Sequence, residues 1–272
     1  MVFDISVSIV LFKSKLSDIE NVLNIVSASN LNIQIFLVDN SPSPLLENQI
    51  PKQNYLEYIF NGKNLGYGGG HNVALESPNK SSKFHLVLNA DVEFKAEILE
   101  SIYDFMSKRN DVGLLCPKVL NVDGSNQYSA KLLPSPINLI VRRFVPIKFI
   151  QDRMNYRYEL QFFDYNRIIN VPYLSGCFMF ISGDALEKVK GFDDRFFMYP
   201  EDIDLTRRIH KYYKTLFFPE VTIVHEHGKG SYKNKKLLYY HVTSMIKYFN
   251  KWGWIFDKER KIFNHRTLKQ FN

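Results

Sequence analysis

Three carboxylates occupy four consecutive positions in the segment FFMYPEDIDLTRRIHKYY. Acidic residues after the proline suit the start of a helix, where each stabilises the positive end of the dipole by roughly 0.3–1 kcal/mol. Asp204 also has Arg208 four residues on, which is the spacing of a helical ion pair. Glu201 and Asp202 have only Leu and Thr at that spacing. We therefore expect Glu201 and Asp202 to be the pair that moves a proton.

The segment NLGYGGGHN places four glycines in five positions. It lacks the GK[ST] ending of a Walker loop, and it does not follow the first strand as a dinucleotide fingerprint would. Two interpretations stay open. One is a glycine-rich turn before a helix; the other is a loop whose backbone approaches a ligand, with the amides of Asn64 and Asn72 able to hydrogen-bond to it.

Two further segments end in groups that could hold a cation. VLNADVEF delivers Asn89 and Asp91 two residues apart, and a carboxylate there suits Mg²⁺ or Mn²⁺ together with diphosphate oxygens. VTIVHEHGKGS places His225 and His227 on one side of a strand end, where they could bind a metal or a diphosphate. Each has a plain alternative: an Asx-capped strand end for the first pair, and a surface or interface feature for the second.

Apolar runs alternate with helical patterns along the first 120 residues. We expect strands at residues 5–12, 33–40, 56–60, 84–91 and 111–119, and helices within 13–29, 69–77 and 96–109. This alternation predicts an α/β fold, with a sheet covered by helices on both faces. Polar residues collect at the carboxyl ends of these strands, where ligands of such folds bind. They are Asp39 and Asn40, residues 64–72, and residues 89–91.

The composition is that of a globular protein, with 45% hydrophobic residues among 272. Regular alternation lapses between residues 121 and 170, and we expect this insert to lie on the acceptor or membrane side. The net charge of +7 belongs to the end of the chain, because residues 229–272 hold 11 Lys or Arg against 2 Asp or Glu. Residues 1–228 therefore carry −2. Basic residues interleaved with Tyr, Phe and Trp suit an anionic membrane surface better than nucleic acid, and a solvated basic helix pair is the alternative.

The cysteines and the apolar runs predict where the protein works. Cys116 and Cys177 lie far apart in apolar settings, as core thiols of a reducing compartment do. The N-terminus lacks the pattern of a secretory signal, and no run approaches the ~18 apolar residues of a spanning helix. We expect a cytoplasmic protein that is peripheral at the inner face of the cytoplasmic membrane.

Taken in order, these segments resemble the family 2 glycosyltransferases, and within them the bacterial rhamnosyltransferase-like enzymes of O-antigen and surface polysaccharide synthesis. The resemblance is carried by VSIVLF, LVDNSP, NLGYGGGHN, LVLNADV, YLSGCFMFISGDALEKVKGFDDRFFMYPEDIDLTRRI and VTIVHEHGKGS. It implies a GT-A fold, a mixed and mostly parallel sheet flanked by helices, in a domain of residues 1–228. Residues 229–272 would follow as a basic, aromatic, helical extension.

The resemblance also implies roles for residues. Asp202 would be the catalytic base, with Glu201 supporting it, and NAD stands where such enzymes carry the DXD metal motif. Asp91 would be the retained metal-binding acid, and one of His225 and His227 would complete the Mg²⁺ or Mn²⁺ site. The nucleotide-sugar would be bound by the following residues: Asp39, Asn40, Asn64, Gly66, Gly69, Asn72, Asn89 and Asp91.

The predicted function is an inverting transfer of a sugar, L-rhamnose from dTDP-L-rhamnose, to a lipid-diphosphate-linked saccharide. A UDP-hexose donor is the alternative within the family, because Asp39 can hydrogen-bond to N3 of thymine or uracil alike. Outside the family, the alternatives are a sugar nucleotidyltransferase and a non-enzymatic membrane or nucleic-acid interaction protein. The first of these should carry a glycine-rich, basic loop after the first strand, where this chain reads FKSKLSD.

Overall fold

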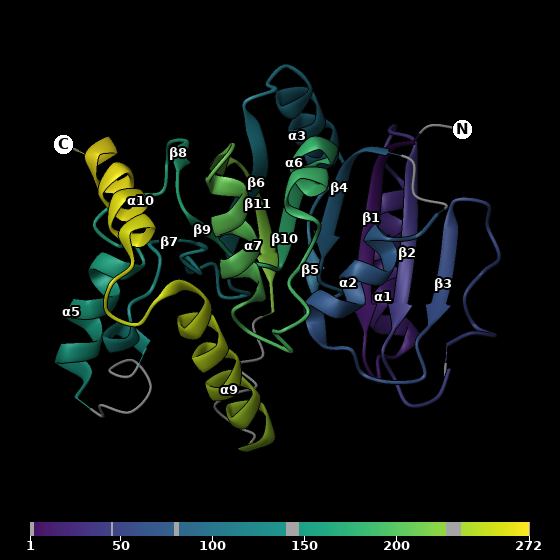
Figure 1. Ribbon diagram of the computed structural model, residues 1–272. Helices are drawn as coiled ribbons and strands as arrows, with labels where there is room; N and C mark the ends of the chain where they lie inside the picture. The colour runs from purple at the N-terminus through teal and green to yellow at the C-terminus, as the bar shows by residue number, and fades with distance from the viewer. Residues whose placement is uncertain (1–2, 45, 79–81, 140–146, 227–234, 272) are drawn as a thin grey trace.

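The computed structural model describes residues 3–44, 46–78, 82–139, 147–226 and 235–271 (Figure 1). Its strands are β1 (Phe3–Leu11), β2 (Ile33–Asp39), β3 (Leu56–Phe60), β4 (Ser82–Leu88), β5 (Val92–Glu93), β6 (Val112–Leu120), β7 (Ala130–Lys131), β8 (Ile169–Asn170), β9 (Tyr173–Leu174), β10 (Phe178–Ser182) and β11 (Lys214–His225). Its helices include α1 (Leu16–Ser27), α2 (Gly66–Leu75), α3 (Glu97–Ser107), α5 (Lys148–Tyr158), α6 (Gly183–Val189), α7 (Glu201–His210), α9 (Lys235–Trp252) and α10 (Lys258–Leu268), and η1 (Lys269–Phe271) is a 3₁₀ turn.

One mixed, mostly parallel sheet carries the fold. Its strand order is β3-β2-β1-β4-β10-β6-β11-β5, and β8 pairs with β11. Strands β1 to β4 run parallel, β10 inserts antiparallel between β4 and β6, and β11 returns parallel to β6. The parallel strands therefore end at one edge of the sheet, which is where polar residues were expected to meet.

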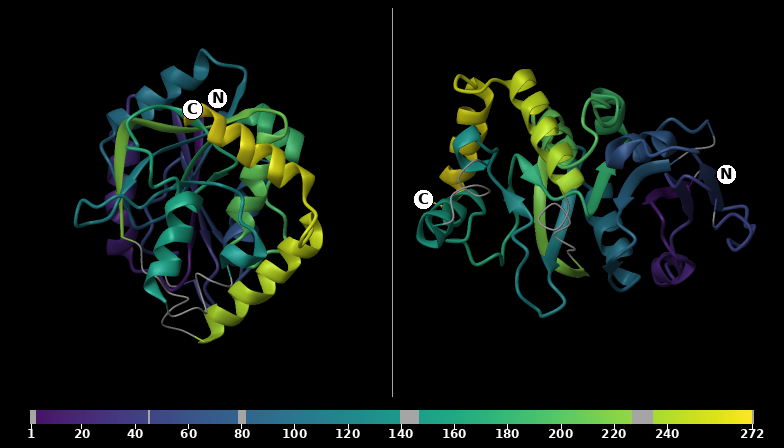
Figure 2. Two further views of the ribbon diagram at one scale, coloured as in Figure 1. Left: turned by 90° about the vertical axis from the view of Figure 1, so that its left-hand side faces the viewer. Right: turned by 90° about the horizontal axis from the view of Figure 1, so that it is seen from below.

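Helices cover both faces of the sheet (Figure 2, right). On one face, α1 and α3 bury Val22 and Ile102 in the main core; on the other, α2 packs Ala74 against Phe36 and Val38 of β2. Strand β2 is buried along its whole length, because the side chains that point to either face of the sheet are covered. The α/β prediction is confirmed, as are the expected strands and helices of the first 120 residues to within a few residues.

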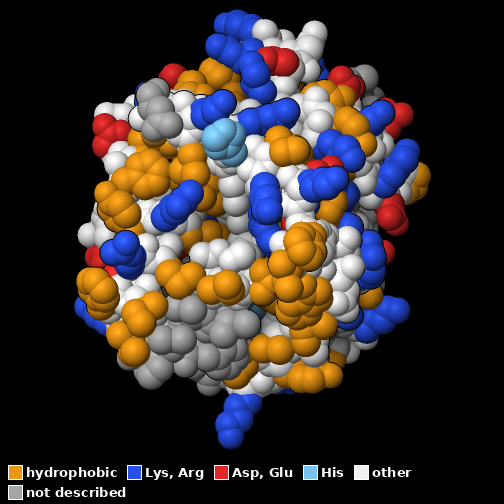
Figure 3. Space-filling view, turned by 60° about the vertical axis from the view of Figure 1, so that its left-hand side comes forward, with side chains coloured by type: hydrophobic (Ala, Val, Ile, Leu, Met, Phe, Trp, Pro, Cys, Tyr) orange, Lys and Arg blue, Asp and Glu red, His pale blue; other side chains and the backbone are white. Residues whose placement is uncertain are grey.

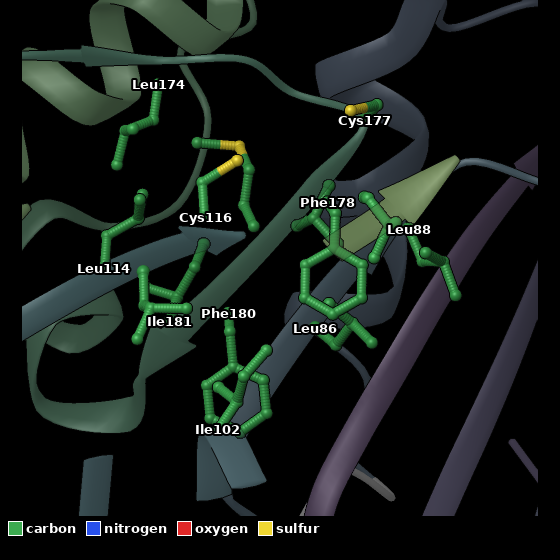
Figure 4. Close-up of a cluster of buried hydrophobic side chains, with 14 of the residues drawn as sticks. Leu86, Leu88, Ile102, Leu114, Cys116, Leu174, Cys177, Phe178, Phe180 and Ile181 are labelled. Carbon is green, nitrogen blue, oxygen red and sulfur yellow. The ribbon is translucent and has the colours of Figure 1, made fainter. Parts of the chain in front are cut away.

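The main core is aromatic and aliphatic, and it contains both thiols (Figure 4). Cys116 and Cys177 are buried and free, as the sequence predicts. Part of the 121–170 segment belongs to this core as well. Tyr165 is buried, and its hydroxyl donates to the carbonyls of Ala130 and Glu159.

The C-terminal helices are fastened to α7 by buried charge. The guanidinium of Arg207 donates to both carboxylate oxygens of Asp257 at 2.7 and 2.6 Å, and it stacks 3.9 Å from the ring of Trp252. Tyr248 and Phe249 of α9 pack with Ile203 of α7 in a second, smaller core. Among the described residues, no helix has the length and apolar character needed to cross a bilayer.

Candidate active site

A cleft of about 910 Å³ opens where the acidic helix α7 meets the strand ends. Its lining includes Glu201 and Asp202 from α7, Asn89 after β4, and His225 at the end of β11. The two most distant of these residues in the sequence, Asn89 and His225, are 136 positions apart. The fold thus brings together the proton-transfer candidates and most of the cation-binding candidates.

Asp202 lies at the first turn of α7, half-buried in the cleft wall. Its Oδ2 accepts hydrogen bonds from the amide of Gly176 at 3.0 Å and the hydroxyl of Tyr173 at 3.4 Å, and its Oδ1 accepts from the amide of Ile203 at 2.7 Å. Burial raises the pKa of Asp202, while these donors and the positive charge of Lys131 hold it back. The result is an oriented carboxylate with a pKa shifted toward neutrality, which suits a general base.

Glu201 has a drier setting. It is 4% exposed, and its Oε2 finds no hydrogen-bond partner within the described ranges. Burial and the neighbouring charge of Asp202 raise the pKa of Glu201 further than that of Asp202. Two adjacent carboxyl groups with separated pKa values can take different roles, with Glu201 protonated while Asp202 is ionised.

Asp204, the third acid, is structural. Its Oδ2 accepts from Arg208 at 2.7 Å, which is the predicted helical ion pair. Its Oδ1 accepts from the indole of Trp252 at 2.8 Å and the ammonium of Lys251 at 2.6 Å. Asp204 therefore holds α9 against α7, a contact that sequence spacing did not indicate.

Asn89 and His225 line another part of the cleft, and Asp91 lies beside it. The imidazole Nε2 of His225 lies 3.3 Å from Asp91 Oδ1 and 3.3 Å from Asn89 Nδ2, and Nδ1 lies 3.0 Å from Gln127 Oε1. Burial lowers the pKa of His225, but the contacts with Asp91 and Cys177 outweigh it and raise the pKa to about 10. His227 lies outside the described residues.

These residues fit a divalent cation whose coordination shell is completed by the phosphate oxygens of a bound nucleotide-sugar. The described residues contain no group of three or more His, Cys, Asp or Glu side chains placed to hold a metal ion by themselves. Mg²⁺ and Mn²⁺ do not need one, since they commonly use one or two protein ligands plus phosphate oxygens. Asp91 is half exposed beside the cleft and can contribute its carboxylate to such a shared site. His225 lines the cleft, and it would bind the cation only on losing the proton that its raised pKa retains, because a metal ligand must be deprotonated.

Tyr67 joins the two sides of the cleft. Its hydroxyl lies 2.9 Å from Asn89 Oδ1 and 2.7 Å from the carbonyl of Gly176, whose amide in turn donates to Asp202. A short chain of hydrogen bonds therefore runs from the candidate base to the candidate cation site. Sequence reasoning did not single out Tyr67, although it lies inside the glycine-rich segment.

The loop interpretation of the glycine-rich segment is wrong from its third residue on, because α2 begins at Gly66. The glycines serve close packing. A Cβ on Gly66 would lie 2.1 Å from the carbonyl oxygen of Phe197, and one on Gly70 would lie 2.7 Å from Val10. Gly66 also has φ of +79°, a conformation that side chains disfavour. Gly69 has a looser contact, 3.2 Å to Leu65.

The other residues predicted to bind the nucleotide gather at the ends of β2 and α2. Asn40 donates to the carbonyl of Gly66 at 2.9 Å, and Asn64 Oδ1 accepts from the amide of Gly66 at 2.8 Å. Asp39 is buried and accepts from Tyr58 and from the amide of Ser41. The hydrogen-bond partners of these three side chains lie within the protein, and the bonds of Asn40 and Asn64 hold the start of α2 beside the end of β2.

Asn72 is occupied by structure. Its Nδ2 donates to the carbonyl of Phe192 at 2.9 Å and to Asp194 at 2.7 Å, and its Oδ1 accepts from the amide of Phe192 at 2.8 Å. These bonds tie α2 to the chain that leads into α7. The helix with Tyr67 is thus held to the segment that delivers Asp202.

Several cleft residues escaped sequence reasoning: Tyr67, Gln127, Lys131, Glu159, Tyr173 and Gly176. Lys131 pairs with Glu159 at 3.2 Å in the cleft wall. Tyr173 begins β9 and Gly176 precedes β10, and only the three-dimensional pairing of β7 with β9 brings Lys131 beside Tyr173.

Comparison with known proteins identifies the family and the fold. A sequence profile described as Glycosyl transferase family 2 matches residues 6–190, more than half of the chain. The chain belongs to glycosyl transferase family 2. This family 2 glycosyltransferase has the GT-A fold that the sequence predicts, and the sugar nucleotidyltransferase and non-enzymatic alternatives are set aside.

Three curated relatives of this family 2 glycosyltransferase are named as a hexosyltransferase and two rhamnosyltransferases. It is 28% identical over 215 residues to the low-salt glycan biosynthesis hexosyltransferase Agl10 of Haloferax volcanii, which covers 78% of this chain and 63% of that protein. It is 24% identical over 232 residues to the N-acetylglucosaminyl-diphospho-decaprenol L-rhamnosyltransferase of Mycobacterium tuberculosis, covering 80% and 75%. It is 27% identical over 197 residues to rhamnosyltransferase WbbL of Escherichia coli K12, covering 70% and 71%.

Solved structures support the fold. GalNAc-T7 with UDP, GalNAc and Mn²⁺ superposes with a TM-score of 0.61 at 14% identity, covering 83% of this chain and 43% of that one. Residues 1–349 of S. aureus TarS superpose with a TM-score of 0.58 at 16% identity, covering 82% and 60%. At these identities the likeness extends to the fold.

Proposed function

We propose that this glycosyltransferase moves L-rhamnose from dTDP-L-rhamnose to a lipid-diphosphate-linked saccharide, with inversion at the anomeric carbon. Two of the relatives above are rhamnosyltransferases by name, and one is named for a diphospho-decaprenol acceptor. The observation that carries the mechanism is the cleft with Asp202 on one side and Asn89 and His225 on the other.

The proposed step is a single displacement. The acceptor hydroxyl oxygen bonds to the anomeric carbon, and the bond from that carbon to the diphosphate oxygen breaks with its electron pair leaving on the diphosphate. Asp202 takes the hydroxyl proton, held toward the cleft by its bonds to Gly176 and Tyr173. Glu201 lines the cleft next to Asp202 with its Oε2 buried and unpartnered, and we give it a supporting role beside the base.

The leaving diphosphate is placed at the Asp91 and His225 side. A Mg²⁺ or Mn²⁺ held by these two residues would neutralise the charge that develops on the diphosphate. Mn²⁺ is named with the GalNAc-T7 structure, which shares the fold. Asn89 stands where the DXD motif has its first acid, and its side-chain amide would contact the cation or the diphosphate. The hydroxyl of Tyr67, 2.9 Å from Asn89 Oδ1, orients that amide. We place Asp39, Asn40, Asn64, Gly66, Gly69 and Asn72 along the nucleotide and sugar, directly or through α2.

A UDP-hexose donor is the second candidate. It is favoured by the hexosyltransferase relative and by the UDP named with GalNAc-T7. The membrane location that we propose, peripheral at the inner face of the cytoplasmic membrane, follows from the lipid-linked acceptor and the basic C-terminal helices.

The test is thermal stabilisation of the purified protein by dTDP- and UDP-sugars with Mg²⁺, Mn²⁺ or EDTA. We expect dTDP-L-rhamnose with a divalent cation to raise the unfolding temperature most. Stabilisation by UDP-sugars alone would replace the rhamnose donor with a hexose donor. Asp91→Asn should weaken the dependence on the cation, whereas His265→Ala on the exposed side of α10 should leave it unchanged.

A further inference from the structure

Two helices beside the cleft expose large apolar side chains to solvent. On and next to α5 these are Ile147, Phe149 and Tyr156, which are 52%, 74% and 53% exposed. On α9 they are Tyr239 and Ile246, which are 65% and 42% exposed. We call this surface the α5–α9 face. Figure 3 shows hydrophobic side chains gathered over the lower part of this side of the molecule.

The charges on the α5–α9 face are predominantly positive. Helix α5 presents Lys148, Arg153 and Arg157 against the single acid Asp152. Helix α9 contains basic residues, among them the exposed Lys235, Lys236 and Lys247, and no Asp or Glu. Figure 3 shows Lys and Arg side chains interspersed with and above the hydrophobic ones, with few acids among them. Apolar anchors with surrounding cations are the combination that binds anionic lipid.

Both helices border the cleft. Asn155 of α5 is part of its lining. On the other side, Tyr199 lines the cleft and stacks on His241 of α9 with ring centroids 4.5 Å apart, and Phe197 contacts Tyr240 at 4.3 Å. In Figure 1, α5 and α9 extend beyond the edge at which β1, β2 and β3 end. A bilayer in contact with both helices would therefore face the side of the cleft from which an acceptor would reach Asp202.

We infer that the α5–α9 face docks on a bilayer containing anionic lipid and turns the cleft toward it. The inference rests on the proposed function, because it supplies the reason for such an orientation: a lipid-linked acceptor enters from the bilayer between α5 and α9. Phe149, Tyr239 and Ile246 enter the headgroup region, and the lysines and arginines beside them meet lipid phosphates.

Vesicle binding without any sugar substrate tests this surface by itself. The intact protein is sedimented with vesicles of phosphatidylglycerol mixed with phosphatidylcholine, and with vesicles of phosphatidylcholine alone. We expect binding to the mixed vesicles that weakens as salt rises. Phe149→Asp and Ile246→Asp should each weaken vesicle binding by about tenfold, since each removes an apolar side chain that would insert into the bilayer and adds a charge that anionic lipid repels.

The matched control is Ile262→Asp on α10, because Ile262 is 46% exposed and α10 lies above α5 and α9 in Figure 1, away from their lower ends. It should bind vesicles as the wild type does. Unchanged binding by the Phe149→Asp/Ile246→Asp double variant would overturn the inference, as would equal binding to phosphatidylcholine alone. So would a dimer in light scattering that Phe149→Asp converts to a monomer, since a second copy would then cover the face.

Donor stabilisation and transfer to a detergent-solubilised acceptor separate this inference from the proposed function. The double variant should retain both, because neither helix residue touches Asp202 or the cation side of the cleft. Retained vesicle binding with an inactive wild type would leave the docking face standing and remove the proposed function.

Discussion

The amide of Gly176 donates a 3.0 Å hydrogen bond to Asp202, while the carbonyl of the same residue lies 2.7 Å from the hydroxyl of Tyr67. One peptide segment thus orients the proposed base and connects it, through Tyr67 and Asn89, to the side of the cleft where the diphosphate would leave. No side chain at position 176 is needed for this, and little space is left for one.

Gly176→Ala is expected to lower kcat by about tenfold with little loss of donor affinity. The added Cβ would lie 3.2 Å from Asp202 Cβ, so the carboxylate must shift by a few tenths of an ångström, and misplaced catalytic groups are costly. Steady-state kinetics measures the effect. Gly183→Ala, which meets a backbone carbonyl at 3.1 Å outside the cleft, is the control and should leave kcat near wild type.

Tyr173→Phe is expected to shift the acid limb of the pH–rate profile to higher pH. The raised pKa of Asp202 places the wild-type limb above the ~3.9 of a solvated aspartate, and rate is lost as pH falls through it. Removing the Tyr173 hydroxyl removes a donor that favours the ionised form. The readout is kcat/KM against pH. A limb that moves down, or moves equally in Tyr103→Phe, which loses a bond to Asp4 outside the cleft, would contradict this.

Glu201→Gln is expected to stabilise the fold at pH 8 while lowering transfer. Glu201 has a folded-state pKa raised above the ~4.3 of the unfolded chain. The folded state then binds the proton more tightly, so stability is full below the unfolded pKa and is lost as pH rises through the folded one. A neutral amide avoids that loss, by at least ~1 kcal/mol. Chemical denaturation at pH 4 and pH 8 checks it, with the exposed Glu187→Gln as a neutral control.

Arg207→Met is expected to destabilise the protein by about 3–5 kcal/mol, because it leaves Asp257 buried and charged without its partner. The double variant Arg207→Met/Asp257→Leu should recover a large part of this. Lys214→Met breaks an ion pair whose side chains are 57% and 56% exposed, and it should cost only ~0–1 kcal/mol. Denaturant midpoints compare the three, and equal costs for the two single variants would disprove the account of the buried pair.

Sequence reasoning went furthest where one local pattern has one physical meaning. Strand-length apolar runs and helical spacing located the sheet and its helices, and the Asp204–Arg208 ion pair followed from spacing alone. The glycine-rich segment was misjudged because glycine disfavours helix interiors, yet here tertiary contact requires it: Phe197 and Val10 approach α2 too closely for any side chain.

Contacts between distant segments could not be predicted in the same way. Tyr173 reaches Asp202 across 29 positions, and Trp252 reaches Asp204 across 48. Tyr173 begins a segment that carries the family resemblance, but its spacing from Asp202 does not indicate this contact, and Trp252 lies in none of those segments. The charge of the basic C-terminal segment suggested a membrane contact. In the structure, Lys251 and Asp257 of this segment also form ion pairs with Asp204 and Arg207 of α7.

The role of Asp202 is tested most directly by transfer and donor binding in Asp202→Asn. The amide keeps the shape of the side chain but cannot take a proton, so we expect transfer to fall by about 10²–10⁴-fold while stabilisation by the donor is unchanged. Asp184→Asn, at the exposed first turn of α6, controls for loss of a helix-terminal acid and should remain active. Undiminished transfer by Asp202→Asn would contradict the proposed base.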